Sequence, residues 1–280
     1  MSKILDGEAL SLKIQEDIKH EIKNCMIRPS VAVIQIGENA ASDAYISRKE
    51  KACNNVGIYF RLYKFEEGTP ELTIINKIKE LNNDEYVNGV LVQLPIPVRY
   101  NEKRIINSIS NSKDVDGLTD INVGRLINGK KTLVPCTPLG IMRMLEENEI
   151  EVAGKHVVII GRGKLVGRPL FTLMLAQDAT VTVCHSKTVD LKQIAKQADV
   201  LVSACGVPNL VTADMVKDGA IVIDAGINIT GDKIVGDVDY DKVSKKASYI
   251  TPVPKGVGPM TVAMLLENII TCYNNKGTTK

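Results

Sequence analysis

The sequence predicts an α/β fold with two domains, the second of which is built on a doubly wound parallel sheet. Short runs rich in valine and isoleucine alternate with helical patterns, as they do in right-handed βαβ units. The runs fall into two sets, separated by the polar, turn-rich segment 107–138. A glycine-rich turn follows the first strand of the second set, which is where an open parallel sheet binds its ligand.

The first set contains three expected strands and three expected helices. Apolar residues recur at helical spacing in 8–24, and the helix 42–56 has Ser42 as its candidate cap and Gly57 as its stop. The expected strands are 31–36, 58–63 and 89–94, and the third helix is 71–82.

The second set contains four expected strands, with a last helical pattern after it. The strands are 156–160, 180–184, 199–204 and 220–224, and the helices are 138–148, 166–177, 189–197 and 261–273. Segment 107–138 is expected to carry loops and the crossover between domains. Sequence alone does not decide where the last helix packs. The division that we expect is 1–137 plus 261–280 for a substrate domain and 138–260 for a nucleotide-binding domain.

Composition and charge exclude several classes of protein. The chain has 280 residues, 44% of them hydrophobic, and a formal net charge of +2. That charge is too small for a nucleic-acid or membrane surface, and no basic block is interleaved with aromatic residues. The N-terminus lacks the apolar core of a signal peptide, and the longest uncharged run, 200–213, is too short to span a bilayer. We therefore expect a cytoplasmic protein that binds neither membrane nor nucleic acid.

Cysteine and histidine spacing gives no sign of a metal site. The six cysteines are scattered without a CxxC pair, which indicates reduced and mostly buried thiols. The three histidines, His20, His156 and His185, are too far apart for a local metal motif.

The expected strand 156–160 runs directly into a glycine turn that opens a helix. Gly161, Gly163 and Gly167 have the spacing GxGxxxG, one residue longer than the usual dinucleotide fingerprint. Glycine allows the backbone to approach a pyrophosphate, and the helix N-terminus supplies oriented N–H groups. A Rossmann-like cofactor site at Gly161, Arg162 and Gly163 follows. The alternative is a tight turn without a ligand.

The residues after strand 180–184 favour NADP over NAD. An NAD enzyme usually places an acid there to hold the ribose hydroxyls, but this chain has His185, Ser186, Lys187 and Thr188. Hydroxyl groups, a lysine and the nearby Arg162 suit a 2′-phosphate. NAD remains the less favoured cofactor, and a merely solvated loop is the competing interpretation.

Two further strand ends are candidates for the nicotinamide side of this site. Gly206 follows strand 199–204, and Gly226 and Ile227 follow strand 220–224. Ligands of open parallel sheets lie beyond the carboxyl ends of the strands. Structural turn glycines are the competing interpretation.

The candidate chemical site lies in the first set. Tyr45 and Lys49 are four residues apart on an expected helix and share a face. A lysine can donate or accept a proton, because burial or a nearby cation lowers its pKa. Arg48 and Lys51 leave open a simple solvated, basic face.

Three more segments favour a chemical site over a solvated helix face. Val92, Gln93 and Leu94 end a buried strand before two prolines, so that Gln93 sits where sites form. The turn 113–117 carries two acids, and a carboxylate there can bind an amino-pyrimidine edge or merely cap a turn. The Gly/Pro-rich segment 253–261 is expected to be a rigid loop for close ligand contact or for a chain reversal.

Together these stretches resemble the methylenetetrahydrofolate dehydrogenase/cyclohydrolase family. They occur in family order and span nearly the whole chain: DAYISRKEKACNNVGI, GVLVQLPIP, KDVDGLTDINVGRL, VPCTP, IIGRGKLVGRP, TVTVCHSKT, IDAGIN, GDVDY and TPVPKGVGPMT. The resemblance implies NADP-dependent oxidation of 5,10-methylene-tetrahydrofolate and hydrolysis of the methenyl product to 10-formyl-tetrahydrofolate. It also implies a role in one-carbon metabolism and purine biosynthesis, a homodimer, and a cleft between two domains.

The resemblance assigns roles to individual residues. It makes Lys49 the cyclohydrolase lysine, assisted by Gln93, with Tyr45 positioning the folate and Asp116 anchoring the pterin. Substrate contacts are implied for Tyr45, Lys49, Val92, Gln93, Leu94, Asp116, Pro254, Lys255, Gly256, Val257 and Gly258. Cofactor contacts are implied for Gly161, Arg162, Gly163, Ser186 and Ile227, and no metal is implied.

Three departures from the family pattern and two rival functions remain. Gly163 stands where serine is usual, Leu139 where a basic residue is common, and Lys255 where the family has glycine. A side chain at 255 is expected to obstruct the folate or to add a cation for its glutamate tail.

The rivals are a monofunctional folate dehydrogenase and another two-domain NAD(P) dehydrogenase acting on a small hydroxy acid. A non-catalytic nucleotide-binding module is a third class.

Overall fold

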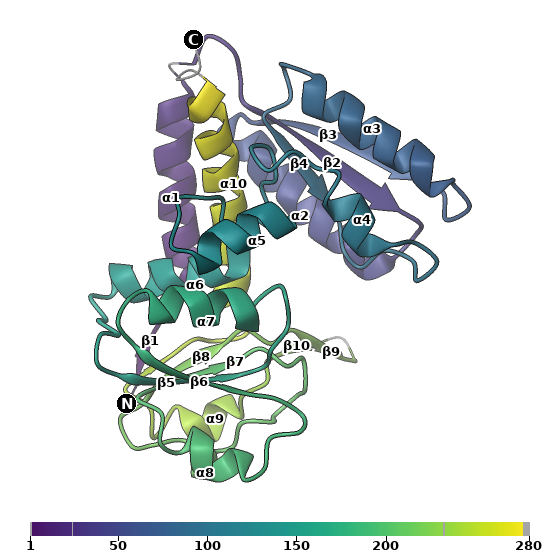
Figure 1. Ribbon diagram of the computed structural model, residues 1–280. Coiled ribbons are helices and arrows are strands. Elements are labelled where there is room, and N and C mark those ends of the chain that lie inside the picture. The colour runs from purple at the N-terminus through teal and green to yellow at the C-terminus, as the bar shows by residue number, and fades with distance from the viewer. Residues whose placement is uncertain (1, 24, 232, 277–280) are drawn as a thin grey trace. The chain divides into compact units, whose positions relative to one another are not determined.

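The computed structural model describes residues 2–23, 25–231 and 233–276 and divides into two compact units (Figure 1). Unit 1 comprises Met1–Ser11 and Pro135–Thr261, and unit 2 comprises Leu12–Val134 and Val262–Lys280. Residue 24, at the end of the expected helix 8–24, lies outside the described residues, as do residues 1 and 277–280 of the expected substrate domain.

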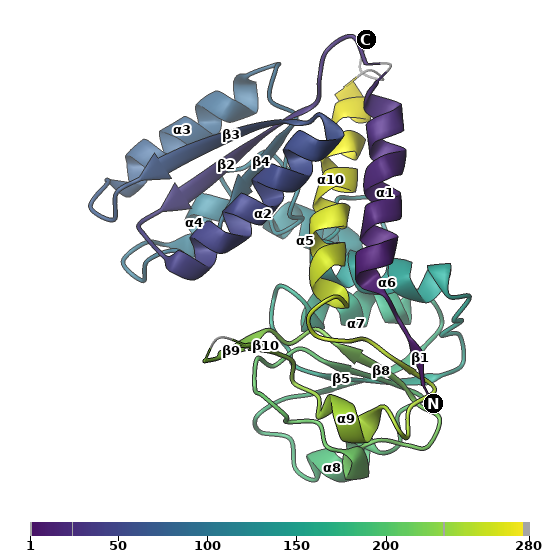
Figure 2. The same ribbon diagram turned by 180° about the vertical axis from the view of Figure 1, so that it is seen from behind.

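Unit 2 is built on a three-stranded parallel sheet in the order β3-β2-β4. The strands are β2 (Ser30–Ile36), β3 (Tyr59–Phe65) and β4 (Gly89–Val92). Helices α2 (Ala40–Val56) and α3 (Glu71–Asn83) cover opposite faces of this sheet (Figures 1 and 2). Ile74, Ile78 and Leu81 of α3 are buried against the sheet, since apolar residues recur on that face of the helix.

Four other helices complete the description of this part of the chain. They are α1 (Gly7–Ile22), α4 (Glu102–Ile106), α5 (Asp120–Ile127) and α10 (Val257–Lys276); the first residues of α1 and α10 belong to unit 1. Helices α1 and α10 lie side by side (Figures 1 and 2), and Asn274 Nδ2 donates to Glu21 Oε1 at 3.0 Å. The last helix therefore packs within unit 2.

Unit 1 is built on a six-stranded parallel sheet in the order β1-β11-β8-β7-β5-β6. Helices α6 and α7 lie on one face, and α8 and α9 lie on the other (Figure 1). The strands are β1 (Lys3–Ile4), β5 (His156–Ile160), β6 (Thr180–Cys184), β7 (Val200–Ser203), β8 (Ile221–Asp224) and β11 (Tyr249–Ile250). The helices are α6 (Cys136–Glu147), α7 (Gly167–Leu175), α8 (Leu191–Ala195), η1 (Ala213–Met215) and α9 (Tyr240–Val243). A hairpin of β9 (Asn228–Thr230) and β10 (Lys233–Val235) extends from this unit.

The doubly wound parallel sheet expected from the sequence is confirmed, and each expected strand overlaps an observed one. Continuous Val/Ile runs identified these strands because a parallel sheet buries both of its faces. The two-residue strands β1 and β11 were missed, since they are too short to show a pattern. Because β1 pairs with β11, the first residues of the chain belong to unit 1.

Three local expectations were wrong. The cap of α2 is Asn39, not Ser42: the Asn39 side chain accepts a hydrogen bond from the Ser42 amide at 3.0 Å. Segment 107–138 is not all loop, since it contains α5, which begins at the Thr119 cap. The segment 253–261 is only partly a loop, because α10 already begins at Val257. Gly57 ends α2 as expected, with a φ of 94° that suits glycine.

No helix among the described residues is both long enough and apolar enough to cross a membrane.

Candidate active site and cofactor site

The structure joins two of the predicted catalytic residues directly. Lys49 Nζ donates a hydrogen bond to Gln93 Oε1 at 3.0 Å. Gln93 follows β4, and its backbone amide donates to Ile34 O at 2.8 Å while its side-chain amide donates to Leu94 O at 2.7 Å. Gln93 is only 8% exposed. The Gln93 oxygen that accepts the hydrogen bond from Lys49 is therefore held in place at the end of a buried strand.

Tyr45 and Lys49 are half-buried on the same face of α2. The exposed Arg48 lies with its guanidinium carbon 5.8 Å from the centre of the Tyr45 ring. Lys51, one of the residues that left open the alternative of a solvated helix face, is exposed. The helix thus presents Lys49 to a structured polar partner and leaves its other basic residues in solvent.

Gln35 is a site residue that the sequence analysis missed. Ile34 pairs with Val92 across β2 and β4, so Gln35 lies beside Gln93. It is buried, and its side-chain amide donates to Asp43 Oδ1 at 2.7 Å in the first turn of α2. Gln35 therefore ties the sheet to the helix that carries Lys49. The available signal was a single polar residue within the apolar run 31–36.

The two acids of the turn 113–117 have different environments. Asp114 is 1% exposed and accepts hydrogen bonds from the Thr119 amide (2.8 Å) and from Asn122 Nδ2 (2.9 Å). Burial raises the pKa of the Asp114 carboxyl above its usual value, and these hydrogen bonds oppose the rise. Asp116 is only half-buried. The structure thus separates a structural acid from a candidate ligand-binding acid.

We expect replacement of Asp114 to lower the stability of the fold, and replacement of Asp116 to weaken substrate binding instead. Asp114→Asn leaves buried donors poorly matched and should destabilise the fold by about 1–3 kcal/mol in urea unfolding. Asp116→Asn should change stability by less than about 0.5 kcal/mol but raise the KM for the folate substrate. A normal KM in Asp116→Asn would remove this residue from the substrate site.

The glycine turn after β5 is built on close backbone approaches. A Cβ on Gly161, whose φ is 126°, would lie 2.5 Å from Ala204 O, and a Cβ on Gly167 would lie 2.0 Å from Gly161 O. A Cβ on Gly163 would meet no atom within 4 Å. Packing therefore requires glycine at 161 and 167, whereas position 163 faces open space.

The turn after β6 lies beside the glycine turn, because β5 and β6 are neighbours in the sheet. The amide of His185 donates to Thr188 Oγ1 at 2.8 Å, and the amide of Lys187 donates to His185 Nδ1 at 3.1 Å. Ser186 and Lys187 are exposed, as is Arg162 in the glycine turn. This turn holds hydroxyl and cationic groups at the carboxyl edge of the sheet, as a 2′-phosphate site requires.

The predicted substrate segment 254–258 belongs to unit 1. Pro254, Lys255 and Gly258 are exposed, whereas Gly256 and Val257 are buried. Lys255 Nζ lies 3.0 Å from Glu8 Oε2, and this hydrogen bond raises the pKa of the lysine. The ammonium group thus has a carboxylate partner within its own unit.

Lys255 occupies a backbone conformation that favours glycine. Its φ is 88°, in the left-handed region. We expect Lys255→Gly to be more stable than Lys255→Ala by about 1 kcal/mol, because both lose the exposed ion pair but only glycine relieves the backbone strain. Chemical denaturation measures the difference, and equal stabilities would contradict it.

The cysteines are mostly buried, as expected. None of the six forms a disulfide, and Cys53, Cys136, Cys184 and Cys272 are buried, whereas Cys205 is exposed. Burial raises the pKa of Cys53, on α2, to about 12, so this thiol is not a nucleophile near neutral pH. No cluster of three potential metal-ligating side chains occurs within the described part of the chain.

Two buried acids of unit 1 were also missed. Asp224 ends β8, and Asp237 follows β10; both are buried, at 3% and 0% exposure. Burial raises the pKa of Asp224 to about 6, against the lowering effect of three backbone hydrogen bonds. Asp224 lies in the stretch IDAGIN and Asp237 in the stretch GDVDY, and the sequence analysis attached no role to either acid.

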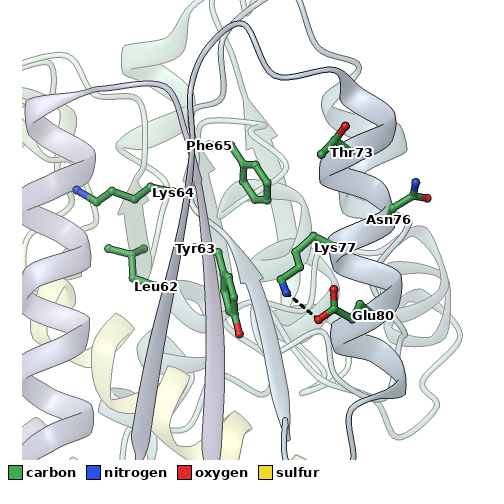
Figure 3. A pocket seen from close by; sticks show the side chains of 8 residues that line it. All are labelled: Leu62, Tyr63, Lys64, Phe65, Thr73, Asn76, Lys77 and Glu80. Carbon is green, nitrogen blue, oxygen red and sulfur yellow. Dashed lines mark hydrogen bonds and ion pairs between the residues drawn. The ribbon is translucent and has the colours of Figure 1, made fainter.

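A surface cavity of about 510 Å³ lies over β3 and α3 (Figure 3). In it, Lys77 forms an ion pair with Glu80 at 2.7 Å. The lining residues are Leu62, Tyr63, Lys64, Phe65, Thr73, Asn76, Lys77 and Glu80. None of the predicted site residues lines this cavity, so the candidate site is elsewhere.

The geometry defines a two-unit α/β enzyme with a dinucleotide-binding sheet in one unit and a lysine–glutamine pair in the other. A family model for the tetrahydrofolate dehydrogenase/cyclohydrolase catalytic domain matches residues 5–116, and one for the NAD(P)-binding domain of the same family matches residues 135–277. The chain belongs to this family. It is a bifunctional enzyme that acts on tetrahydrofolate derivatives.

Curated and solved relatives cover nearly the whole chain. The bifunctional protein FolD of Thermodesulfovibrio yellowstonii is 50% identical over 273 residues, 96% of each chain. The crystal structure of a bifunctional FolD from Campylobacter jejuni has a TM-score of 0.97 at 48% identity and covers 99% of this chain and 100% of the other. A dehydrogenase-cyclohydrolase from Trypanosoma brucei, in complex with NADP and an inhibitor, has a TM-score of 0.95 at 35% identity over 99% of this chain and 98% of the other.

Proposed function

We propose that this chain oxidises 5,10-methylene-tetrahydrofolate to 5,10-methenyl-tetrahydrofolate with NADP and hydrolyses the product to 10-formyl-tetrahydrofolate. Family membership supports both activities. The observation that carries the proposal is the 3.0 Å hydrogen bond between Lys49 and Gln93, since a merely solvated helix gives no reason for this pairing. It favours the bifunctional enzyme over a monofunctional dehydrogenase.

The oxidation needs binding and orientation more than it needs side-chain chemistry. NADP, when bound, supplies the acceptor for the hydride that leaves the folate methylene carbon. Gly161 and Gly163 let the backbone approach the pyrophosphate, and Arg162 and Ser186 bind the 2′-phosphate. Ile227 is placed against the nicotinamide. Proximity and alignment of the reacting carbons account for the rate.

The hydrolysis needs proton transfers, which we assign to Lys49. Water adds to the cationic methenyl carbon and loses one proton; the resulting hydroxyl loses its proton as the bond to N5 breaks, and N5 gains one. The sum is one water consumed and one proton released. Lys49, held by Gln93 Oε1, accepts and returns these protons, while Tyr45 positions the pterin.

The remaining substrate contacts are assigned by position. Val92 and Leu94 flank Gln93 at the strand end, and Asp116 binds the amino-pyrimidine edge through charge-assisted hydrogen bonds. The segment from Pro254 to Gly258 contacts the folate. We keep 1–137 plus 261–280 as the substrate domain and 138–260 as the NADP-binding domain. Within this division, residues 1–11 contribute strand β1 to the sheet of the NADP-binding domain.

The cofactor preference is supported by the turn after β6. It has Ser186 and Lys187 where an NAD enzyme usually has an acid, and the relative from T. brucei was solved with NADP. The test is a spectrophotometric assay with 5,10-methylene-tetrahydrofolate that follows the methenyl product and the reduced cofactor. We expect a higher kcat/KM with NADP than with NAD; no turnover with either would contradict the proposed function.

The proposal also covers the assembly of the protein and its location in the cell. We infer a homodimer, which the open edge of β3 supports, because an unpaired strand edge is a ready site for pairing with a second copy. We also infer a cytoplasmic location, because the cysteines form no disulfide, as is usual in a reducing compartment. Sedimentation of the full chain as a monomer, or recovery of the protein outside the cytoplasmic fraction, would contradict these inferences.

A further inference from the structure

Asp237 accepts hydrogen bonds from the loop that follows β7. Its carboxylate is fully buried and accepts five hydrogen bonds. The donors are Ser203 Oγ (2.9 Å), the backbone amides of Cys205 (2.8 Å), Gly206 (3.2 Å) and Val207 (2.8 Å), and Asn228 Nδ2 (3.1 Å). A carboxylate offers only acceptors, so it matches a ring of donors that an amide does not.

Asp224, at the end of the neighbouring strand β8, forms a second set of hydrogen bonds that includes the backbone of Asp237. Its carboxylate accepts from the backbone amides of Gly226 (2.9 Å), Asp237 (3.0 Å) and Val238 (2.9 Å). A Cβ on Gly226 would lie 2.1 Å from Asp237 Oδ1, and a Cβ on Gly236 would lie 1.9 Å from Asp224 Oδ2. The two acids and two glycines interlock, and we call Asp224, Gly226, Gly236 and Asp237 the carboxylate clamp.

The clamp holds Ile227 from both sides. The preceding residue, Gly226, donates its amide to Asp224, and the following residue, Asn228, donates its side chain to Asp237. Ile227 is nevertheless 43% exposed. The β9–β10 hairpin pairs Asn228 with Val235, and Asp237 follows two residues later.

The clamp also supports the glycine turn. Asp237 fixes Cys205, and the neighbouring Ala204 packs so closely on Gly161 that a Cβ there would lie 2.5 Å from Ala204 O. Cys205 Sγ donates to Ile160 O at 3.2 Å, at the end of β5. A shift of the loop 203–207 would therefore be transmitted to the turn that is assigned to the pyrophosphate.

We propose that Asp237, with Asp224, is a positioning residue for the cofactor: the clamp orients Ile227 toward the nicotinamide and fixes the backbone on which the pyrophosphate turn rests. Both carboxylates are buried, so we assign them no direct contact with substrate or cofactor. This inference rests on the proposed function, because it assigns the clamp to the dehydrogenase reaction alone. The cyclohydrolase reaction, which uses Lys49 of unit 2 and no cofactor, is then an internal control.

The test compares Asp237→Asn, Asn228→Ala and the control Asp241→Asn in the full-length enzyme. Asp241 is an exposed acid on α9, so its replacement makes the same chemical change outside the clamp. NADPH affinity is measured by fluorescence titration, the dehydrogenase by kcat and the KM for NADP, and the cyclohydrolase by methenyl-tetrahydrofolate decay without cofactor. We expect the two clamp variants to lose NADPH affinity and dehydrogenase kcat/KM on the order of tenfold or more. Their cyclohydrolase rate and the whole control should stay near wild type.

Asn228→Ala keeps the test decisive if Asp237→Asn does not fold, since it removes a half-buried donor and leaves the carboxylate in place. Wild-type NADPH affinity in Asn228→Ala would overturn the proposal. A parallel loss of both activities and of thermal stability in this variant would also overturn it, because that outcome marks a purely structural role. Failure of the proposed function itself is distinguishable: the wild type would then turn over neither folate.

Discussion

Lys49→Met is expected to reduce cyclohydrolase kcat by about 10²–10⁴-fold, because it removes the group that transfers protons during water addition and ring opening. Methionine has a similar length and keeps most of the packing of the half-buried side chain. NADP affinity should be unchanged, since the proposed cofactor residues belong to unit 1 and Lys49 to unit 2. Decay of methenyl-tetrahydrofolate, corrected for its spontaneous hydrolysis, measures the effect.

The matched control for this variant is Lys51→Met. Lys51 is an exposed lysine on the same helix, so the replacement removes the same charge away from Gln93. We expect a wild-type cyclohydrolase rate. Equal losses in Lys49→Met and Lys51→Met would assign the effect to the overall charge of α2, and a full rate in Lys49→Met would remove Lys49 from the mechanism.

Gly161→Ala is expected to abolish measurable NADP binding at concentrations that saturate the wild type. Its Cβ would lie 2.5 Å from Ala204 O, and the φ of 126° is unfavourable for alanine. The backbone must shift, at a cost of about 1–3 kcal/mol in stability, and the shift displaces the turn that approaches the pyrophosphate. Fluorescence titration with NADPH and thermal unfolding measure the two effects separately.

Gly163 provides the matched control within the same turn. Its Cβ would meet no atom within 4 Å, so Gly163→Ala should change stability by less than about 0.5 kcal/mol. Gly163→Ser restores the hydroxyl that is usual in the family and should bind NADP more tightly than Gly163→Ala. If Gly161→Ala and Gly163→Ala behaved alike, the close backbone contact would not be the cause.

The sequence predicted every strand of the two parallel sheets except the two-residue strands β1 and β11, because buried parallel strands are continuous apolar runs. The separate placements of Lys49 on a helix face and of Gln93 at a strand end were also predictable, whereas the pairing of the two was implied by the family resemblance. Such placements depend on local pattern and on the general geometry of parallel sheets. They do not require knowledge of the tertiary packing.

The residues that were missed depend on packing between distant segments. Gln35 gains its importance from the strand register that sets it beside Gln93, and Asp237 from a hairpin that carries it back under Gly226. The ion pair of Lys255 with Glu8 was missed for the same reason, because the two residues are distant in sequence. A single sequence carries no signal for such pairings.

The most direct test is product analysis after a fixed amount of NADP has been reduced with 5,10-methylene-tetrahydrofolate. For the wild type we predict 10-formyl-tetrahydrofolate in an amount equal to the reduced cofactor, with little methenyl product. For Lys49→Met we predict the same reduced cofactor with methenyl-tetrahydrofolate accumulating in its place. Equal amounts of 10-formyl product from both enzymes would contradict the assignment of the hydrolysis to Lys49.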